Sequence, residues 1–162
     1  MNILHVFNSD SGGGVGGTLE FINYCEKSYP NFKHFIILPS GSSKNKIKNI
    51  LSSKSNSHLF TVPLHWWNKK TNHSFIYNIF IEIFGQVNTV FHLKSIIIIR
   101  NIIIKNKIDI VYTTTSCIKS GAIAARISSI PHLWHIKERV GENGFMKFYH
   151  KDEKLINIFF KN

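Results

Sequence analysis

A glycine-rich segment follows the first apolar run of the sequence and could hold an anion. Five of the six residues from Gly12 to Gly17 are glycine, and the apolar run Ile3 to Phe7 precedes them. Glycines let a ligand approach the backbone closely, and unpaired N–H groups at a helix start favour negative charge. The segment therefore predicts a ligand loop, with a plain surface loop as the alternative.

The same segment matches two nucleotide-binding motifs only in part. Gly12 to Gly17 fits G-x-G-x-x-G, but Pro39-Ser40-Gly41 stands where dinucleotide-binding folds carry an acidic residue for the ribose. The phosphate loop G-x-x-x-x-G-K-[ST] needs a lysine, whereas Thr18 follows Gly17 directly. The prediction is therefore limited to an anion-binding loop.

Hydroxyl side chains cluster where another apolar run ends. The residues Thr113 to Ser116 follow Ile108 to Tyr112, and Lys119 comes next along the chain. Such hydroxyls can hold sugar hydroxyls or phosphate oxygens, and the lysine can neutralise an anion. The alternative is that Thr115 or Ser116 only caps the following helix.

A third polar group contains two histidines. The apolar run from His132 to Ile136 ends at Lys137-Glu138-Arg139. On a strand, His132 and His135 point to opposite faces, so the spacing argues against a metal site shared with Glu138. A histidine at a strand end suits polar contact or proton transfer, with a structural role as the alternative.

Apolar runs alternate with segments of helical spacing along the chain. Strands are expected over 3–7, 35–38, 58–63, 108–113 and 132–136, and helices over 18–29, 46–51, 75–84, 90–104 and 118–128. Buried strand runs indicate an α/β fold, a Rossmann-like parallel sheet with helices on both faces. Ligands gather at the carboxyl ends of such strands, where all three polar groups fall.

Composition limits the function classes. The 162 residues suffice for one hydrophobic core, and 20 Lys and Arg against 9 acidic residues give a net charge of +11, which favours anionic partners. Cys25 and Cys117 cannot form a disulfide framework. The most apolar window, residues 90–111, carries too many charges to span a bilayer.

The chain resembles the N-terminal domain of retaining glycosyltransferases of family 4. Four segments carry the resemblance in order: Met1-Asn-Ile-Leu-His-Val-Phe with the glycine loop, Ile108-Asp-Ile-Val-Tyr-Thr-Thr, Gly121-Ala-Ile-Ala-Ala-Arg, and Ile130-Pro-His-Leu-Trp-His-Ile-Lys-Glu. That family has the GT-B fold, two Rossmann-like domains facing each other. The resemblance implies that residues 1–162 form the acceptor-side domain, the N-terminal half of a GT-B fold. It also implies transfer of a sugar from a nucleotide sugar to a lipid-linked or saccharide acceptor, for a surface polysaccharide or glycolipid.

The resemblance also assigns roles to residues. His135 matches a family histidine near the reacting sugar and is the expected catalytic residue. The expected substrate-binding residues are the glycines near the donor phosphates, the strand-end hydroxyls, Lys119 and the polar residues beside His135: Gly13, Gly14, Gly16, Gly17, Thr114, Ser116, Lys119, Glu138 and Arg139. No metal and no cofactor other than the donor nucleotide sugar are expected.

The donor-binding domain of that family, with its paired carboxylates, has no counterpart in the sequence. We therefore expect a truncated chain that has no transferase activity by itself. A cytoplasmic location is expected, at the inner face of the cell membrane if the basic surface and the indoles of Trp66 and Trp67 meet anionic lipid. Packing in the core or at a domain interface is the alternative for these two tryptophans.

Two other function classes stay open. A nucleotide- or dinucleotide-binding module would explain the glycines, but the missing acidic residue counts against it. A nucleic-acid-binding protein would explain the charge, but the sequence shows no recognition helix or RNA-binding signature.

Overall fold

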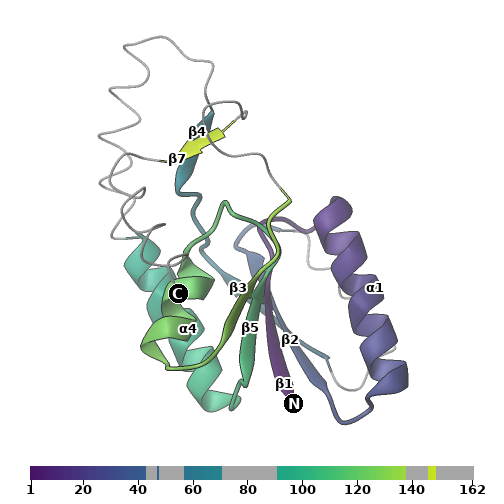
Figure 1. Ribbon diagram of the computed structural model, residues 1–162. Coiled ribbons are helices and arrows are strands. Elements are labelled where there is room, and N and C mark those ends of the chain that lie inside the picture. The colour runs from purple at the N-terminus through teal and green to yellow at the C-terminus, as the bar shows by residue number, and fades with distance from the viewer. Residues whose placement is uncertain (43–46, 48–56, 71–90, 138–145, 149–162) are drawn as a thin grey trace, which may run out of the picture.

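Five parallel strands form the central sheet of the protein. The computed structural model describes residues 1–42, 47, 57–70, 91–137 and 146–148. The sheet has the order β3-β2-β1-β5-β6 (Figure 1), with β1 (Asn2–Val6), β2 (Lys33–Pro39), β3 (Ser57–Val62), β5 (Ile110–Thr113) and β6 (His132–Trp134). All neighbours in it pair in parallel, which confirms the predicted α/β sheet. A small antiparallel ribbon, absent from the sequence prediction, pairs β4 (Asn68–Lys70) with β7 (Met146–Phe148).

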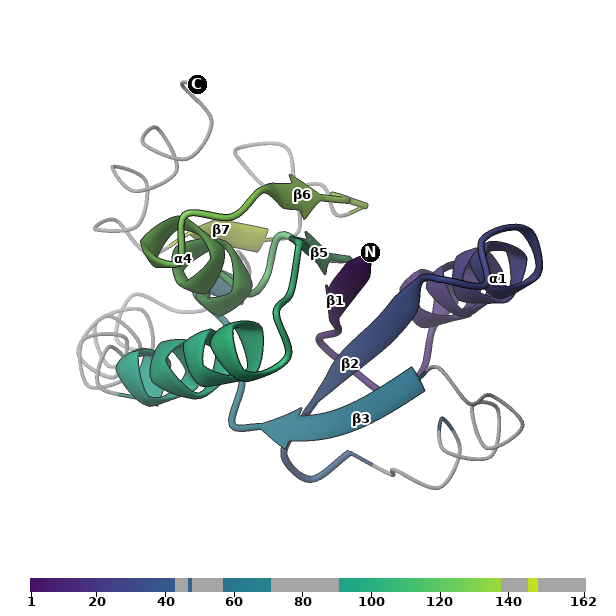
Figure 2. The ribbon, with the colours of Figure 1, turned by 90° about the horizontal axis from the view of Figure 1, so that it is seen from below.

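Helices cover both faces of the sheet, as the strand pattern predicts. Helix α1 (Gly13–Ser28) lies on one face, and α4 (Ser120–Ile127) lies on the other beside a helix described over residues 91–105 (Figure 2). The helices expected over 46–51 and 75–84 fall outside the described residues, apart from the buried Ile47. No helix in the described ranges has both the length and the apolar character needed to cross a membrane.

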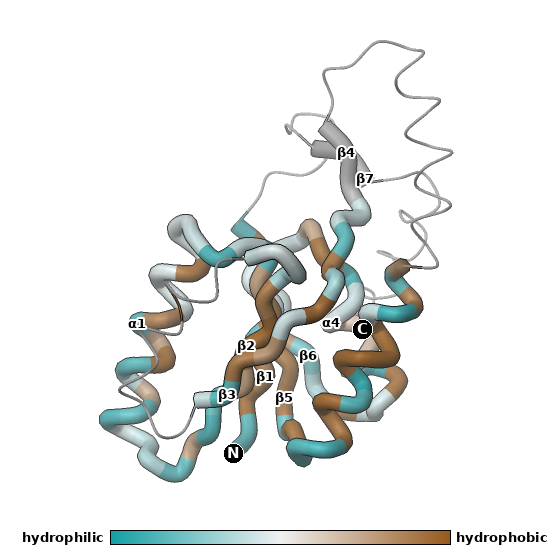
Figure 3. Tube along the Cα trace, turned by 180° about the vertical axis from the view of Figure 1, so that it is seen from behind, coloured by the Kyte–Doolittle hydropathy of each residue, from teal (hydrophilic) through white to brown (hydrophobic). Residues whose placement is uncertain are grey.

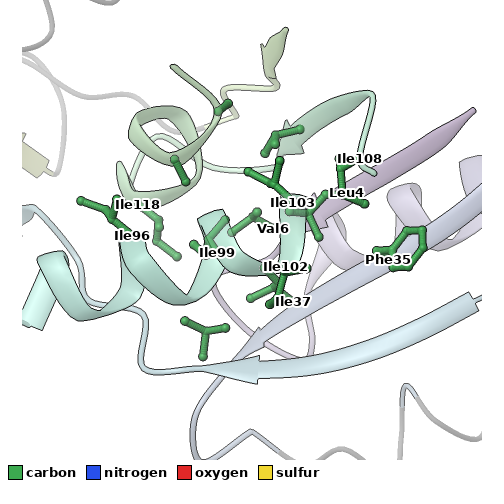
Figure 4. Packing of buried hydrophobic residues seen from close by; sticks show 14 residues of the cluster. Leu4, Val6, Phe35, Ile37, Ile96, Ile99, Ile102, Ile103, Ile108 and Ile118 are labelled. Carbon is green, nitrogen blue, oxygen red and sulfur yellow. The ribbon is translucent and has the colours of Figure 1, made fainter. Parts of the chain in front are cut away.

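Alternation along the strands divides the core into two layers. Leu4 and Val6 of β1 join the cluster beneath α4 and the 91–105 helix (Figure 4), whereas Phe7 joins the smaller cluster beneath α1. Figure 3 shows the hydrophobic residues concentrated along the central strands. This two-sided burial explains why β1 and β2 read as continuous apolar runs in the sequence.

Small residues let α4 lie close to the sheet. Gly121 is buried, and a Cβ placed on it would stand 2.8 Å from Thr113 Oγ1 and 3.2 Å from Val6 Cγ2. Ala124 and Ala125 of the same helix are buried in the core. Close contact between α4 and β5 holds the loop that follows β5 in position, and this loop carries the predicted hydroxyl cluster.

Candidate functional site

The three predicted polar groups meet at the carboxyl edge of the sheet, uppermost in Figure 1. Strands β1 and β5 are neighbours, but the chain leaves β1 for α1 on one face and β5 for α4 on the other. Ligands of open α/β sheets bind at such a switch point. The loops after β1 and β5 are joined there by a hydrogen bond of 3.3 Å from Asn8 Nδ2 to Thr115 Oγ1.

The glycine segment forms the first turn of α1 rather than a loop before it. The helix begins at Gly13, and its N-cap residue is Gly12, whose φ of 102° is a conformation that glycine adopts easily. The expectation that the helix starts at Thr18 with that residue as its cap is wrong. Thr18 lies one turn inside, where its Oγ1 donates to Gly14 O at 2.9 Å. Packing of Val15 and other apolar residues on the sheet outweighs the poor helix propensity of the glycines.

The start of α1 suits an anion. No side chain caps its N-terminus, and the first turn contains no acidic residue. Helix N-termini attract negative charge through their unpaired N–H groups and the helix dipole. Gly13 and Gly16 leave open space where a side chain would stand, and a Cβ on Gly17 would lie 3.7 Å from Lys137 Nζ. An exposed lysine therefore lies next to an uncapped helix start, and sequence reasoning did not place Lys137 among the site residues.

The hydroxyl cluster is buried and holds the loops together. Thr115 Oγ1 accepts a hydrogen bond from the N–H of Cys117 at 3.0 Å, and Thr114 Oγ1 lies 3.5 Å from Val6 O. Thr114 and Ser116 are 4% and 3% exposed. The α4 helix has Lys119 at its N-cap position and no side-chain cap, so neither Thr115 nor Ser116 caps it. The cluster forms the floor of the site, because its side chains face the interior.

His135 stands at the end of β6 on the α1 side of the sheet. Its backbone N–H donates to Thr113 O at 2.8 Å, and its Nδ1 lies 2.5 Å from the hydroxyl of Tyr112. Its side chain is exposed. His132 turns to the other face, where Nε2 lies 2.9 Å from Thr113 Oγ1 and burial lowers its pKa to about 4. The predicted opposition of the two imidazoles is therefore confirmed.

Lys119 and the tryptophans form a separate group behind the loop after β5. Lys119 Nζ lies 5.2 Å from the ring centroid of Trp67, which is buried and donates through Nε1 to Ser116 O. Trp67 stacks on Trp134 at 5.9 Å, and Trp134 Nε1 donates to Thr115 O at 2.6 Å. Trp67 thus has the internal packing role, whereas Trp66 is 44% exposed.

A buried histidine pair lies beneath the site and was missed by sequence reasoning. His5 Nε2 of β1 lies 3.0 Å from His34 Nδ1 of β2, and both rings are fully buried under α1. Burial and then the neighbouring His34 lower the pKa of His5 to about 3. A histidine inside the first apolar run and another directly before the second run were the available signal. Glu138 and Arg139 lie outside the described residues, and within those residues no three metal-ligating side chains come together.

Solved structures with a similar fold are glycosyltransferases. MurG of Acinetobacter baumannii matches 98% of this chain with a TM-score of 0.58 and 13% identity. UGT2 of Phytolacca americana, complexed with UDP-2-fluoroglucose and pterostilbene, matches 86% of it with a TM-score of 0.51 and 16% identity. The chain has the Rossmann-like fold of a GT-B glycosyltransferase domain.

The match covers only part of each of those enzymes. This chain spans 40% of MurG and 31% of UGT2. No protein-family model and no curated protein sequence matches the chain. The likeness therefore establishes the fold, and the function has to be argued from the site.

Proposed function

We propose that this chain is the acceptor-side, N-terminal domain of a GT-B glycosyltransferase. The observation that carries the proposal is the meeting of three features at the switch point of the sheet: the uncapped start of α1, Lys137 beside Gly17, and His135. A nucleotide sugar and a lipid-linked or saccharide acceptor offer matching chemistry, because both combine sugar hydroxyls with charged or polar groups. The resemblance to family 4 adds retention of configuration and a role in surface polysaccharide or glycolipid synthesis.

Two kinds of group in the site have different proposed roles. The N–H groups at the start of α1 and the ammonium of Lys137 are donors and favour an anion, such as a phosphate of the donor or of a lipid carrier. The imidazole of His135 is exposed and held at its backbone, so it can meet a sugar hydroxyl. We assign His135 as the catalytic residue and the N–H groups of Gly13 and Gly14 with Lys137 as the anion-binding group. Gly16 and Gly17 are proposed to let the ligand approach, because the Gly16 N–H already bonds to Gly12 O and Gly16 leaves open space where a side chain would stand.

The remaining predicted residues have less direct roles in the proposal. Thr114 and Ser116 shape the floor of the site from their buried positions, and Lys119 supports that floor through Trp67. Glu138 and Arg139 are proposed beside His135 on the family resemblance alone. The proposed enzyme pairs this domain with a second α/β domain that binds the nucleotide, as the resemblance to family 4 implies.

Contact with an anionic membrane is part of the proposal. The net charge of +11 and the exposed indole of Trp66 both favour the surface of an anionic bilayer. A lipid-linked acceptor would be presented at such a surface, on the cytoplasmic side where nucleotide sugars are available.

Transfer of labelled sugar tests the proposal. The protein as its gene encodes it is incubated with membranes and a panel of radiolabelled nucleotide sugars, and label in the lipid and saccharide fractions is counted. Lys137→Ala should lower the rate of sugar transfer by about 10- to 150-fold, the effect of losing one charge-assisted contact of about 1.5–3 kcal/mol. His135→Ala should abolish most of the sugar transfer.

Lys33→Ala is the matched control. Lys33 is an exposed lysine at the start of β2, so it lies at the amino ends of the parallel strands, away from the carboxyl ends that carry the site. Its loss removes the same charge. If Lys33→Ala and Lys137→Ala lose sugar transfer equally, the effect comes from overall charge, and the assigned site is overturned. Wild-type transfer in His135→Ala would remove that residue from the reaction.

A further inference from the structure

One side of α1 changes from glycine to aromatic side chains along its length. Gly13, Gly17, Phe21 and Tyr24 follow one another at intervals of four, four and three residues, so they lie in one row along the helix. All four are exposed. The row therefore offers open backbone at the start of the helix and aromatic surface about two turns further on.

This row borders the proposed site. A Cβ on Gly17 would lie 3.7 Å from Lys137 Nζ, and one turn further on the ring of Phe21 stacks on the ring of Tyr112, with 6.3 Å between the centroids. The Tyr112 hydroxyl lies 2.5 Å from His135 Nδ1. A cation, an aromatic pair and the proposed catalytic residue therefore meet beside the same side of α1.

Leu133 of β6 adds to the apolar surface at Tyr112. The two residues are partners in the register of β5 and β6, so their side chains lie on the same face, the α1 side. Leu133 is 52% exposed and Phe21 is 44% exposed. A single exposed apolar side chain is ordinary, but two that adjoin one ring next to a proposed site indicate a binding surface.

We propose that Phe21 and Leu133 are specificity-determining residues that hold the apolar chain of a lipid-linked acceptor, whose phosphate lies between Lys137 and the start of α1. The row matches such an amphiphile in charge and polarity. The N–H groups and the ammonium at one end favour the phosphate, and the aromatic and aliphatic groups at the other end gain free energy when a chain covers them.

The spacing of the two ends suits one molecule. Gly17 and Phe21 are four residues apart, which is about 6 Å along the helix axis, so a phosphate and the chain attached to it can occupy both ends together. A free saccharide would instead place hydroxyls on apolar side chains, where a hydroxyl that loses water without a new hydrogen bond is penalised. The role of the amphiphile as acceptor rests on the proposed function, whereas the binding of its chain does not.

Binding of alkyl phosphates tests the inference without a transfer assay. The protein as its gene encodes it is titrated with inorganic phosphate, butyl phosphate and octyl phosphate, and NMR follows the amides of Gly13 and Gly14 and the methyl groups of Leu133. All three ligands should shift the glycine amides, and octyl phosphate should shift the Leu133 methyl groups most.

The affinity should grow with the length of the chain. Full burial of one CH2 group strengthens binding by about 4-fold, and a chain on an open surface buries about half of its area, so each CH2 group should contribute about 2-fold. Octyl phosphate should therefore bind about 10- to 20-fold more tightly than butyl phosphate.

Variants on two helices locate the chain. Phe21→Ala and Leu133→Ala should each weaken binding of octyl phosphate by about 3- to 10-fold, whereas Lys137→Ala should also weaken binding of inorganic phosphate. Phe91→Ala and Leu93→Ala are the matched controls, because these side chains are 49% and 54% exposed on the helix over residues 91–105, and they should bind octyl phosphate like the wild type. An unchanged response to inorganic phosphate shows that a variant is folded.

Phe21→Leu separates a chain from a sugar. It keeps an apolar side chain and should keep most of the affinity for octyl phosphate. A loss as large as in Phe21→Ala would show that the ring itself is required, which indicates a stacked sugar and overturns the inference. Equal affinities for butyl and octyl phosphate, or equal losses in Phe21→Ala and Phe91→Ala, would overturn it as well. Chain-dependent binding in a protein that transfers no sugar would refute the proposed function alone.

Discussion

Replacing Gly16 by alanine tests whether the glycine segment is helical. Gly16 lies in the second turn of α1, is exposed, and leaves open space where a Cβ would stand. Glycine costs about 1 kcal/mol relative to alanine inside a helix, because the unfolded chain loses more freedom. Gly16→Ala should therefore raise the free energy of unfolding by about 0.5–1 kcal/mol, which corresponds to about 1–4 °C in Tm for a domain of this size.

Urea denaturation followed by circular dichroism measures the change, with an unchanged slope as the sign of two-state unfolding. Gly12→Ala is the control with the opposite sign. Its φ of 102° is strained for alanine and should lower stability by about 1–2 kcal/mol. A loss of stability in Gly16→Ala would refute the helical start of α1. If ligand approach requires this glycine, the same variant should be more stable and yet transfer less sugar.

Three other predictions concern the support of the site. Gly121→Ala should cost about 1–2 kcal/mol in urea unfolding, because overpacking against Thr113 Oγ1 at 2.8 Å exceeds the gain in helix propensity, and adding Thr113→Ala should recover part of the loss. The pKa of His132 is lowered by burial from 6.5 to about 4, so the unfolded chain binds its proton first as the pH falls. The contribution of His132 to stability should drop between about pH 6.5 and 4 by on the order of 3 kcal/mol at most. His132→Asn should reduce the slope by that contribution, while the buried His5 and His92, whose pKa values are also lowered, keep theirs; an unchanged slope would contradict the assigned burial. Trp67→Ala should cost about 3–5 kcal/mol, whereas Trp66→Ala should stay within about 0.5 kcal/mol and weaken binding to anionic vesicles; equal effects of the two variants on unfolding would contradict their placement.

The parallel sheet could be predicted because its strands are buried on both faces. Runs such as Phe35 to Leu38 are apolar at every position, which only a doubly covered strand requires. The helix over residues 91–105 was predicted correctly despite four consecutive isoleucines, since the charged residues at both ends and the length of the segment favour a helix. The start of α1 was not predicted correctly, because its glycine content indicates a loop. The packing that overrides this tendency comes from strands that are distant in the sequence.

Site residues were harder to predict than the strands that carry them. The sequence put hydroxyls at the end of β5, but whether a hydroxyl faces ligand or interior depends on partners far along the chain, such as Asn8 for Thr115. Lys137 was not predicted as a site residue, because its closeness to Gly17 depends on the fold and links two positions that are far apart in the sequence. The β4–β7 ribbon has only three residues in each strand, too few for a periodic signal.

The alternation of side chains along β5 and β6 places a structural pair of residues on one face of the sheet and a proposed functional pair on the other. On β5 and β6, Thr113 and His132 bond to each other on the α4 side, while Tyr112 and His135 bond on the α1 side. A slip of β6 by one residue would move His132 and His135 to the opposite faces, while Thr113 and Tyr112 of β5 would stay where they are. The part-buried Thr113–His132 contact therefore supports the register that presents His135. The structural role of His132 and the proposed catalytic role of His135 both follow from the alternation of side chains along this strand.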